Sequence, residues 1–222
     1  IDATGEARAR VDINETTHDY LLVGRKKGAT SWQTIDHSTD EEDARSYLGY
    51  SDPDDAIFTE RQKPDGISEI VRPNLAAGST TILTPSRPAS DIGLVWDVNT
   101  YGAIALLTTD GMEDHYDWFD KDIGAVHDKL AHAFKGKQVN LINWSKDRTR
   151  FVVDVESGDA PPTYYLLDST AKSLSPLGDV YPELKGVALG HKTYFSCKAA
   201  DGLEIPAYLT LPAGAPATGG KL

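Results

Sequence analysis

The residues with the most chemical potential form one acidic and aromatic run, Glu113-Asp114-His115-Tyr116-Asp117. Two carboxylates on either side of a glycosidic bond could serve as the acid and the base of a glycosidase. The run also fits an exposed β-strand and its turn, a role that requires no chemistry. We therefore assign no catalytic residue to this run, and we name no substrate-binding residue.

Residue types that commonly bind metals are present but dispersed. His127 and His132 lie about 140° apart around a helix axis, and no His-Glu-x-x-His motif occurs. The acidic runs 40–43 and 52–55 could supply oxygen ligands to calcium, but Ile57 stands where an EF-hand loop beginning at Asp52 needs glycine. We predict that both runs are solvated loops between β-sheets and that the protein binds no metal.

The sequence shows no nucleophile and no cofactor motif. Cys197 is the only cysteine, so no disulfide forms within the chain, and we expect a small half-buried thiol. The nearest histidine, His191, falls in the same predicted strand. Glycine-rich phosphate loops and cysteine pairs are missing from the sequence, and so are basic patches that carry aromatic residues. We predict no cofactor.

Charge and hydropathy exclude two classes of partner. The 222 residues include 22 Lys and Arg against 34 Asp and Glu, a net charge of -12. Such an acidic surface repels phosphate backbones, so we expect no nucleic-acid partner. No apolar run approaches the ~20 residues that a membrane helix needs, so we expect no membrane partner.

Short strand signals separated by turns run through most of the chain. The clearest group has four strands, predicted at 138–144, 151–155, 164–168 and 173–177. Four antiparallel strands in succession are typical of one β-propeller blade. The second strand begins at Phe151, and a similar strand begins at Tyr20, 131 residues earlier. Three periods of about 44 residues fill this offset, which is a usual length for a blade.

Three earlier groups follow the same pattern less regularly. Their strands are predicted at 8–14, 20–24 and 32–36, then 56–59, 68–71 and 80–83, then 93–96, 103–107 and 114–119. The fold class is therefore all-β, a partial β-propeller of about four four-stranded antiparallel blades. Trp32, Trp96, Trp118 and Trp144 fall in or at the ends of these strands, and we expect them to pack in the core between blades.

One segment departs from the β pattern. Between Asp122 and Phe134, the apolar residues Ile123, Val126 and Leu130 recur at near-helical spacing. We predict one short amphipathic helix, inserted between blades, that covers a sheet edge or the outer surface of a blade.

The C-terminal part of the sequence has a different organisation. Two strands, 191–197 and 205–211, flank an Asp-Gly turn, and a linker-like stretch follows Pro212. We expect two regions: the partial propeller at 1–188, and the hairpin with its linker at 189–222.

The hairpin at 194–212 resembles the start of the α/β-hydrolase domain in serine peptidases of the prolyl oligopeptidase family. It is most similar to the dipeptidyl-aminopeptidase and acylaminoacyl-peptidase branch. Residues 118–122 and 143–147 resemble late propeller blades of that branch, and 164–168 with 174–178 resemble its final blade. The resemblance covers roughly 118–212 well, and the earlier half only by the rhythm of its strands.

This resemblance implies a seven- or eight-bladed propeller that caps a hydrolase domain with a Ser-Asp-His triad. In that family the nucleophile lies in a Gly-x-Ser-x-Gly elbow, and acidic propeller residues bind the substrate amino terminus in some members. The Glu113–Asp117 run could have that role. The partners implied are the α/β-hydrolase catalytic domain of the same protein and, in the whole enzyme, a peptide substrate.

The sequence departs from the family in its chemistry. No Gly-x-Ser-x-Gly and no oxyanion-hole motif of the His-Gly-Gly type occur. We therefore expect an internal segment of a longer serine peptidase, which gates substrate access and hydrolyses neither peptides nor esters by itself. The alternative is a stand-alone propeller that binds a protein or a glycan. Open blade edges tend to recruit other chains, so we also expect self-association.

Overall fold

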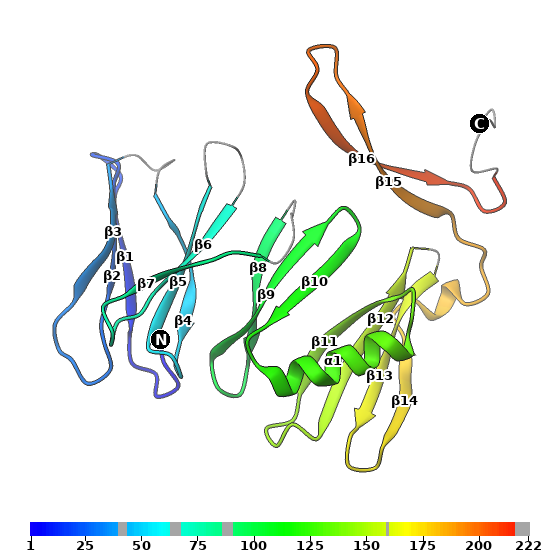
Figure 1. Ribbon diagram of the computed structural model, residues 1–222, viewed down its shortest axis with the longest axis horizontal. Coiled ribbons are helices and arrows are strands. Elements are labelled where there is room, and N and C mark those ends of the chain that lie inside the picture. Colours follow the sequence, from blue (N-terminus) through cyan, green and yellow to red (C-terminus); the bar gives the residue numbers. More distant parts are fainter. Residues whose placement is uncertain (40–43, 63–67, 86–90, 159, 216–222) are drawn as a thin grey trace. The chain divides into compact units, whose positions relative to one another are not determined.

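The computed structural model describes residues 1–39, 44–62, 68–85, 91–158 and 160–215. In these residues the chain forms successive antiparallel sheets and one α-helix (Figure 1). The fold is the predicted all-β partial propeller with one inserted helix. The chain forms two compact units. The first unit has residues 1–110 and 114–120, and the second has residues 111–113 and 121–222.

The first unit contains three sheets in chain order. The first sheet has the strands β1 (Ala9–Asn14), β2 (Asp19–Gly24) and β3 (Gln33–Ser38). The second sheet has β4 (Ser46–Ser51), β5 (Ala56–Gln62), β6 (Ser68–Pro73) and β7 (Thr80–Leu83). The third has β8 (Asp91–Asp97), β9 (Gly102–Asp110) and β10 (Glu113–Trp118).

The second unit contains a four-stranded sheet, a helix and a separate hairpin. The sheet has β11 (Gln138–Trp144), β12 (Arg150–Ser157), β13 (Ala160–Asp168) and β14 (Ser173–Asp179). The helix is α1 (Lys121–Ala133), and the hairpin has β15 (His191–Lys198) and β16 (Glu204–Leu211). A short 3-10 turn, Pro182–Leu184, lies between the sheet and the hairpin. No helix in the described ranges is long and apolar enough to cross a membrane.

The second sheet is buried on both faces. Successive side chains of a strand point to opposite faces, and on β5 both Ile57 and Phe58 are fully buried. Ile57 belongs to a core cluster with Leu22 of the first sheet. Phe58 belongs to another cluster with Leu106 of the third sheet. The three sheets of the first unit therefore pack face to face, as blades do.

A glycine permits a close approach between the second and third sheets. Gly49 lies at a register shift in β4, and a Cβ atom built on it would lie 2.6 Å from Cζ2 of Trp96 in β8. The indole ring therefore occupies the space that a side chain at position 49 would fill. Trp96 also meets Phe58 edge to face, with ring centroids 5.5 Å apart.

The turns at one end of the first unit converge on the β4–β5 turn. Asp55 of this turn is 8% exposed, and its Oδ1 accepts a hydrogen bond of 2.8 Å from the Tyr50 hydroxyl. The backbone N–H of Lys27, in the β2–β3 turn, donates to both carboxylate oxygens at 3.3 and 3.2 Å. The Asp55 carboxylate thus joins the first sheet to the second.

The same turn also contacts two more hairpin turns. The carbonyl of Asp55 accepts from the N–H of Leu75 at 2.8 Å, and the N–H of Asp52 donates to the carbonyl of Tyr101 at 3.0 Å. The side-chain amide of Asn74 donates to the carbonyl of Asp54 at 2.9 Å. The β4–β5 turn is therefore bonded to the β2–β3, β6–β7 and β8–β9 turns.

This arrangement corrects the predicted alignment of the repeats. In the β4–β7 sheet, the turns at this end join the first strand to the second and the third strand to the fourth. The β2–β3 turn lies at the same end, and β1 precedes β2 in its sheet, so β2 and β3 correspond to the third and fourth strands of a blade. The sequence prediction had aligned β2 with a second strand. The first sheet thus has the second, third and fourth strands, and the third sheet has the first three. The β4–β7 and β11–β14 sheets have four strands each. The prediction missed β4, whose Ser and Gly residues mask its strand pattern.

The helix covers one face of the β11–β14 sheet. That face is apolar, with Phe151, Val153 and Val155 of β12 buried. The ring of Phe134, just after α1, lies 5.1 Å from that of Tyr165 in β13. The predicted helix and its covering role are confirmed.

The predicted core packing between blades is confirmed for Trp96, which packs against the cluster shared by the second and third sheets. Trp118 and Trp144 are buried. The prediction is wrong for Trp32, which is half-buried between the guanidinium groups of Arg10 and Arg25, at 5.3 and 5.0 Å from the ring centroid. It lies just before β3, beside the arginines of β1 and the β2–β3 turn, so it forms cation–π contacts instead.

The close approach at Gly49 makes a stability prediction. We expect Gly49→Ala to lower the free energy of unfolding by about 1–3 kcal/mol, because the new methyl group displaces the Trp96 ring. Urea unfolding followed by tryptophan fluorescence measures the change. Gly93→Ala is the matched control, because a Cβ there meets no atom within 4 Å. Equal costs for the two substitutions would contradict the packing argument.

A second prediction concerns the Asp55 carboxylate. Asp55→Ala leaves the buried Tyr50 hydroxyl and the Lys27 N–H without their acceptor, and we expect a loss of about 2–3 kcal/mol of unfolding free energy. Asp55→Asn keeps one oxygen acceptor and tolerates the positive φ of 46° at this position, so its loss should be smaller. A larger loss of unfolding free energy for Asp55→Asn than for Asp55→Ala would refute this role of the carboxylate.

A third prediction follows from the ionisation of Tyr50. Burial, and then the hydrogen bond to Asp55, raise the pKa of Tyr50 far above its ordinary value. The folded state holds this proton more tightly than the unfolded state, so stability is complete below the ordinary pKa of about 10 and falls as pH rises above it. We expect Tyr50→Phe to make the alkaline loss of unfolding free energy less steep. An unchanged slope above that pH would contradict this assignment.

Candidate functional site

The acidic and aromatic run lies where a strand was predicted, but most of it is not exposed. It forms most of β10, with Glu113 exposed and the next four residues half-buried. Thr109 donates a hydrogen bond of 2.7 Å to Oδ1 of Asp114. The rings of Tyr116 and Trp118 stack 5.2 Å apart. These contacts lie within the β8–β10 sheet and stabilise it.

The geometry of β10 also separates its carboxylates. Asp114 and Asp117 are three residues apart, and Glu113 and Asp114 are adjacent, so each of these pairs points to opposite faces of the strand. Glu113 and Asp117 share a face, but four residues of a strand separate them by about 13 Å. A glycosidase needs two carboxylates that face one substrate. None of the three pairs has the separation of about 5–9.5 Å on one side of a substrate that a glycosidase needs.

The acidic run at Asp52–Asp55 is a structural turn and not simply a solvated loop. Ser51 is fully buried, Asp55 is buried, and Ser51 donates to Asp54 at 2.6 Å. The prediction of a solvated loop is wrong for Asp55, because its carboxylate has protein donors that replace water. The predicted place between sheets is also wrong, because residues 52–55 join β4 and β5 of one sheet. The other acidic run, 40–43, lies outside the described residues. Within those ranges no group of three or more His, Cys, Asp or Glu side chains could hold a metal ion.

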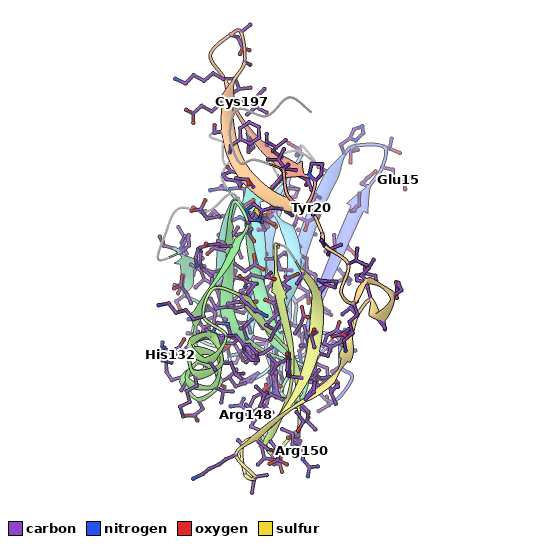
Figure 2. All side chains as sticks on the ribbon, turned by 90° about the vertical axis from the view of Figure 1, so that its right-hand side faces the viewer. Glu15, Tyr20, His132, Arg148, Arg150 and Cys197 are labelled. Carbon is purple, nitrogen blue, oxygen red and sulfur yellow. The ribbon has the colours of Figure 1, made fainter. Side chains whose placement is uncertain are left out.

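The two helix histidines point in different directions, as predicted. His127 is half-buried, and its Nε2 lies 3.1 Å from the carbonyl oxygen of Val139 in β11. Burial lowers the pKa of His127, which favours a neutral ring that donates its Nε2 proton to this carbonyl. His132 is exposed on the helix (Figure 2). The pair therefore cannot chelate one ion, and His127 joins the helix to the sheet.

The best candidate for a functional surface is the β15–β16 hairpin. Its pairing runs from His191 opposite Leu211 to Lys198 opposite Glu204. Residues directly opposite each other project from the same face. One face is therefore largely apolar; it carries Phe195, Cys197, Ile205, Ala207 and Leu209. We call this set the apolar hairpin face.

The apolar hairpin face is open to solvent in the described structure. Phe195, Ile205 and Leu209 are each a little over 40% exposed. Cys197 is also exposed, toward the tip of the hairpin (Figure 2). The prediction of a half-buried thiol is wrong, because a two-stranded ribbon has no second layer of its own to bury this face.

The opposite face of the hairpin contacts the β9–β10 turn. The hydroxyl of Tyr208 donates to the carbonyl oxygen of Gly111 at 2.7 Å. A Cβ built on Gly111 would lie 2.9 Å from the Tyr194 ring, and Gly111 has a φ of +62° that favours glycine. The ammonium group of Lys192 lies 4.9 Å from the Tyr208 ring centroid. The hairpin thus uses its aromatic and polar face within the second unit and leaves the apolar face uncovered.

Sequence comparisons find two curated relatives. No family model matches the chain. Dipeptidyl aminopeptidase BIII of Pseudoxanthomonas mexicana is 27% identical over 144 residues, which cover 65% of this chain and 21% of that protein. Dipeptidyl peptidase family member 6 of Caenorhabditis elegans is 33% identical over 78 residues, 35% of this chain and 10% of that protein. The chain therefore spans at most about a fifth of the length of these relatives.

Solved structures with a similar arrangement include two proteins of low sequence identity. TolB from Acinetobacter baumannii matches 93% of this chain and 47% of its own, with 14% identity and a TM-score of 0.38. A post-proline cleaving enzyme from Rickettsia typhi matches 89% of this chain and 30% of its own, with 14% identity and a TM-score of 0.45.

Proposed function

We propose that this chain, which is related to peptidases of the prolyl oligopeptidase type, is a non-catalytic propeller segment of a serine peptidase. In that enzyme the segment limits the access of substrates to the catalytic serine, and the β15–β16 hairpin joins it to the α/β-hydrolase domain. The branch of the family that we propose is the dipeptidyl-aminopeptidase and acylaminoacyl-peptidase branch. The substrate of the whole enzyme is then a peptide.

The observation that carries this proposal is the apolar hairpin face. Full burial of a large apolar side chain stabilises by roughly 1.5–3 kcal/mol, and Phe195, Ile205 and Leu209 each forgo a part of it because they are a little over 40% exposed. A two-stranded ribbon with one apolar face therefore needs a second layer. The relatives indicate what kind of domain could form that layer. Both are named as peptidases, and most of their length lies outside the match. A catalytic domain in the same protein fits both facts.

The sequence contains no Gly-x-Ser-x-Gly, so the proposal places the catalytic serine in another part of the protein. Reading the gene beyond the codon for Leu222 is a direct test. A Gly-x-Ser-x-Gly elbow within the next couple of hundred codons supports the proposal, and its absence contradicts it.

Cys197 provides a physical test, because it is the only cysteine and lies on the apolar hairpin face. In the 222-residue chain we expect the thiol to react with a maleimide at nearly the rate of a free thiol. In the longer protein that includes the catalytic domain, we expect the rate to fall at least tenfold, because the domain covers this face. Mass spectrometry of the modified peptide measures both rates.

A matched variant separates coverage of the hairpin from general protection. Leu203→Cys in a Cys197→Ser background places a thiol beyond the strands, near the Asp201-Gly202 turn, where Leu203 is 65% exposed. Its rate should change less than that of Cys197 when the catalytic domain is present. Equal rates for Cys197 in the two proteins would contradict the proposed docking and favour a propeller that acts as a separate binding module.

A further inference from the structure

The tip of the β1–β2 hairpin carries an acceptor motif for asparagine-linked sugars. Asn14-Glu15-Thr16 has the required order of asparagine, any residue except proline, and a hydroxyl residue. Asp12 stands at the second position before the asparagine. Bacterial oligosaccharyltransferases select an acidic residue at that position, in addition to the asparagine and the hydroxyl. The run from Asp12 to Thr16 therefore matches the longer and more restrictive form of the motif.

The motif lies where an enzyme can reach it. β1 and β2 are paired as far as Asn14 opposite Asp19, and residues 15–18 form the turn beyond that pair. Every residue from Asn14 to His18 is exposed, and Figure 2 shows Glu15 at the end of the hairpin. This turn projects past the last paired residues, so its exposure does not depend on which strand lies beside β1. Acceptor asparagines are typically found in such surface loops.

The hydrogen bonds of the turn orient the Asn14 side chain. Its Oδ1 accepts from the backbone N–H of Thr16 at 3.0 Å and from that of Thr17 at 3.2 Å. A bond from an asparagine side chain to the backbone two residues later is an Asx turn, which stabilises the reversal of the chain. With Oδ1 held in this way, Nδ2 is turned away from these N–H groups, and no described residue accepts a hydrogen bond from it. The amide nitrogen is therefore presented to solvent.

The hydroxyl of Thr16 is also accessible. Thr16 is exposed, and its hydroxyl forms no hydrogen bond with another described residue. The neighbouring Thr17 differs, because its hydroxyl donates to Oδ2 of Asp19 at 2.6 Å. The motif needs the hydroxyl at the second position after the asparagine. In this turn that hydroxyl is the one without a partner among the described residues.

A second motif of this kind, Asn143-Trp144-Ser145, lacks these properties. It lies at the end of β11, which is paired with β12, and its central Trp144 is buried. The hydroxyl of Ser145 donates to Oδ1 of Asp147 at 2.6 Å. At the second position before its asparagine stands the apolar Leu141. The chain therefore contains its own control for the site in the turn.

We propose that Asn14, and not Asn143, is the acceptor of an asparagine-linked oligosaccharide, which a bacterial oligosaccharyltransferase transfers from a polyprenyl diphosphate carrier. In the transfer, Nδ2 of Asn14 forms a bond to the anomeric carbon of the first sugar. The bond between that carbon and the diphosphate oxygen breaks, the lipid diphosphate leaves with the electron pair, and Nδ2 gives up one proton. The chain supplies the amide together with the carboxylate and the hydroxyl that the transferase recognises. This inference does not depend on the proposed peptidase role.

Trypsin separates the two motifs, so one digest tests the proposal. Cleavage after lysine and arginine releases Asn14 in the peptide 11–25 and Asn143 in the peptide 138–146. The folded 222-residue chain is incubated with a purified bacterial oligosaccharyltransferase and a polyprenyl-diphosphate-linked oligosaccharide. We expect the peptide 11–25 to gain the mass of the oligosaccharide and the peptide 138–146 to keep its original mass. Mass spectrometry of the digest measures both.

A synthetic peptide with the sequence of residues 11–18 is the matched control for the fold. It is tested under conditions in which the transferase modifies a standard acceptor peptide. An unmodified chain overturns the proposal in either case. If the synthetic peptide is modified, the folded turn hides the asparagine, and if it is not, the sequence is no acceptor. Equal modification of the peptides 11–25 and 138–146 would overturn it as well, because the transferase would then not distinguish the exposed turn from the paired strand.

Substitutions in the motif test the groups that the transferase recognises. Thr16→Val keeps the branched shape and removes the hydroxyl, so we expect no glycan at Asn14, whereas Thr16→Ser keeps the hydroxyl and should be modified. Asp12→Ala should lose the modification, and Asp12→Glu should keep it. All four changes are at exposed positions, so the circular dichroism spectra should match that of the original chain. Modification of Thr16→Val or Asp12→Ala as complete as that of the original chain would overturn the assignment of these groups.

Discussion

The buried Asp55 carboxylate is the interaction on which the first unit depends. A carboxylate removed from water is costly unless donors surround it, and here a tyrosine hydroxyl and a backbone N–H from the neighbouring sheet are those donors. The backbone of the same turn then bonds to two further hairpin turns. Sheets held only by side-chain packing could slide over one another, whereas this turn fixes their ends. The core clusters around Ile57 and Phe58 then pack between sheets whose relative positions are already set.

The two faces of the C-terminal hairpin show how one ribbon can serve two layers. Its aromatic and polar face meets Gly111, where the lack of a side chain lets the Tyr194 ring approach. Its other face presents Phe195, Ile205 and Leu209 to solvent. Successive side chains of a strand point to opposite faces, so alternate residues of the hairpin make up each face. The peptidase relatives, of which this chain matches a small part, suggest what kind of layer covers the second face.

The sequence by itself determined most of the strands, the helix and the C-terminal hairpin, because these follow from local periodicity and turn residues; it did not reveal β4, which is rich in Ser and contains Gly49. Residues 122–134 and 191–211 show this clearly. Only the tertiary structure decided the role of Asp55, the setting of Trp32 and the exposure of Cys197. Each of these depends on groups distant in the chain: Lys27 donates to Asp55, Arg10 and Arg25 flank Trp32, and no second layer covers Cys197 in the described residues. The alignment of the blades could not be predicted from the sequence for the same reason. The position of a strand within its blade follows from which turns are hydrogen-bonded to one another, and similar strand sequences do not reveal it.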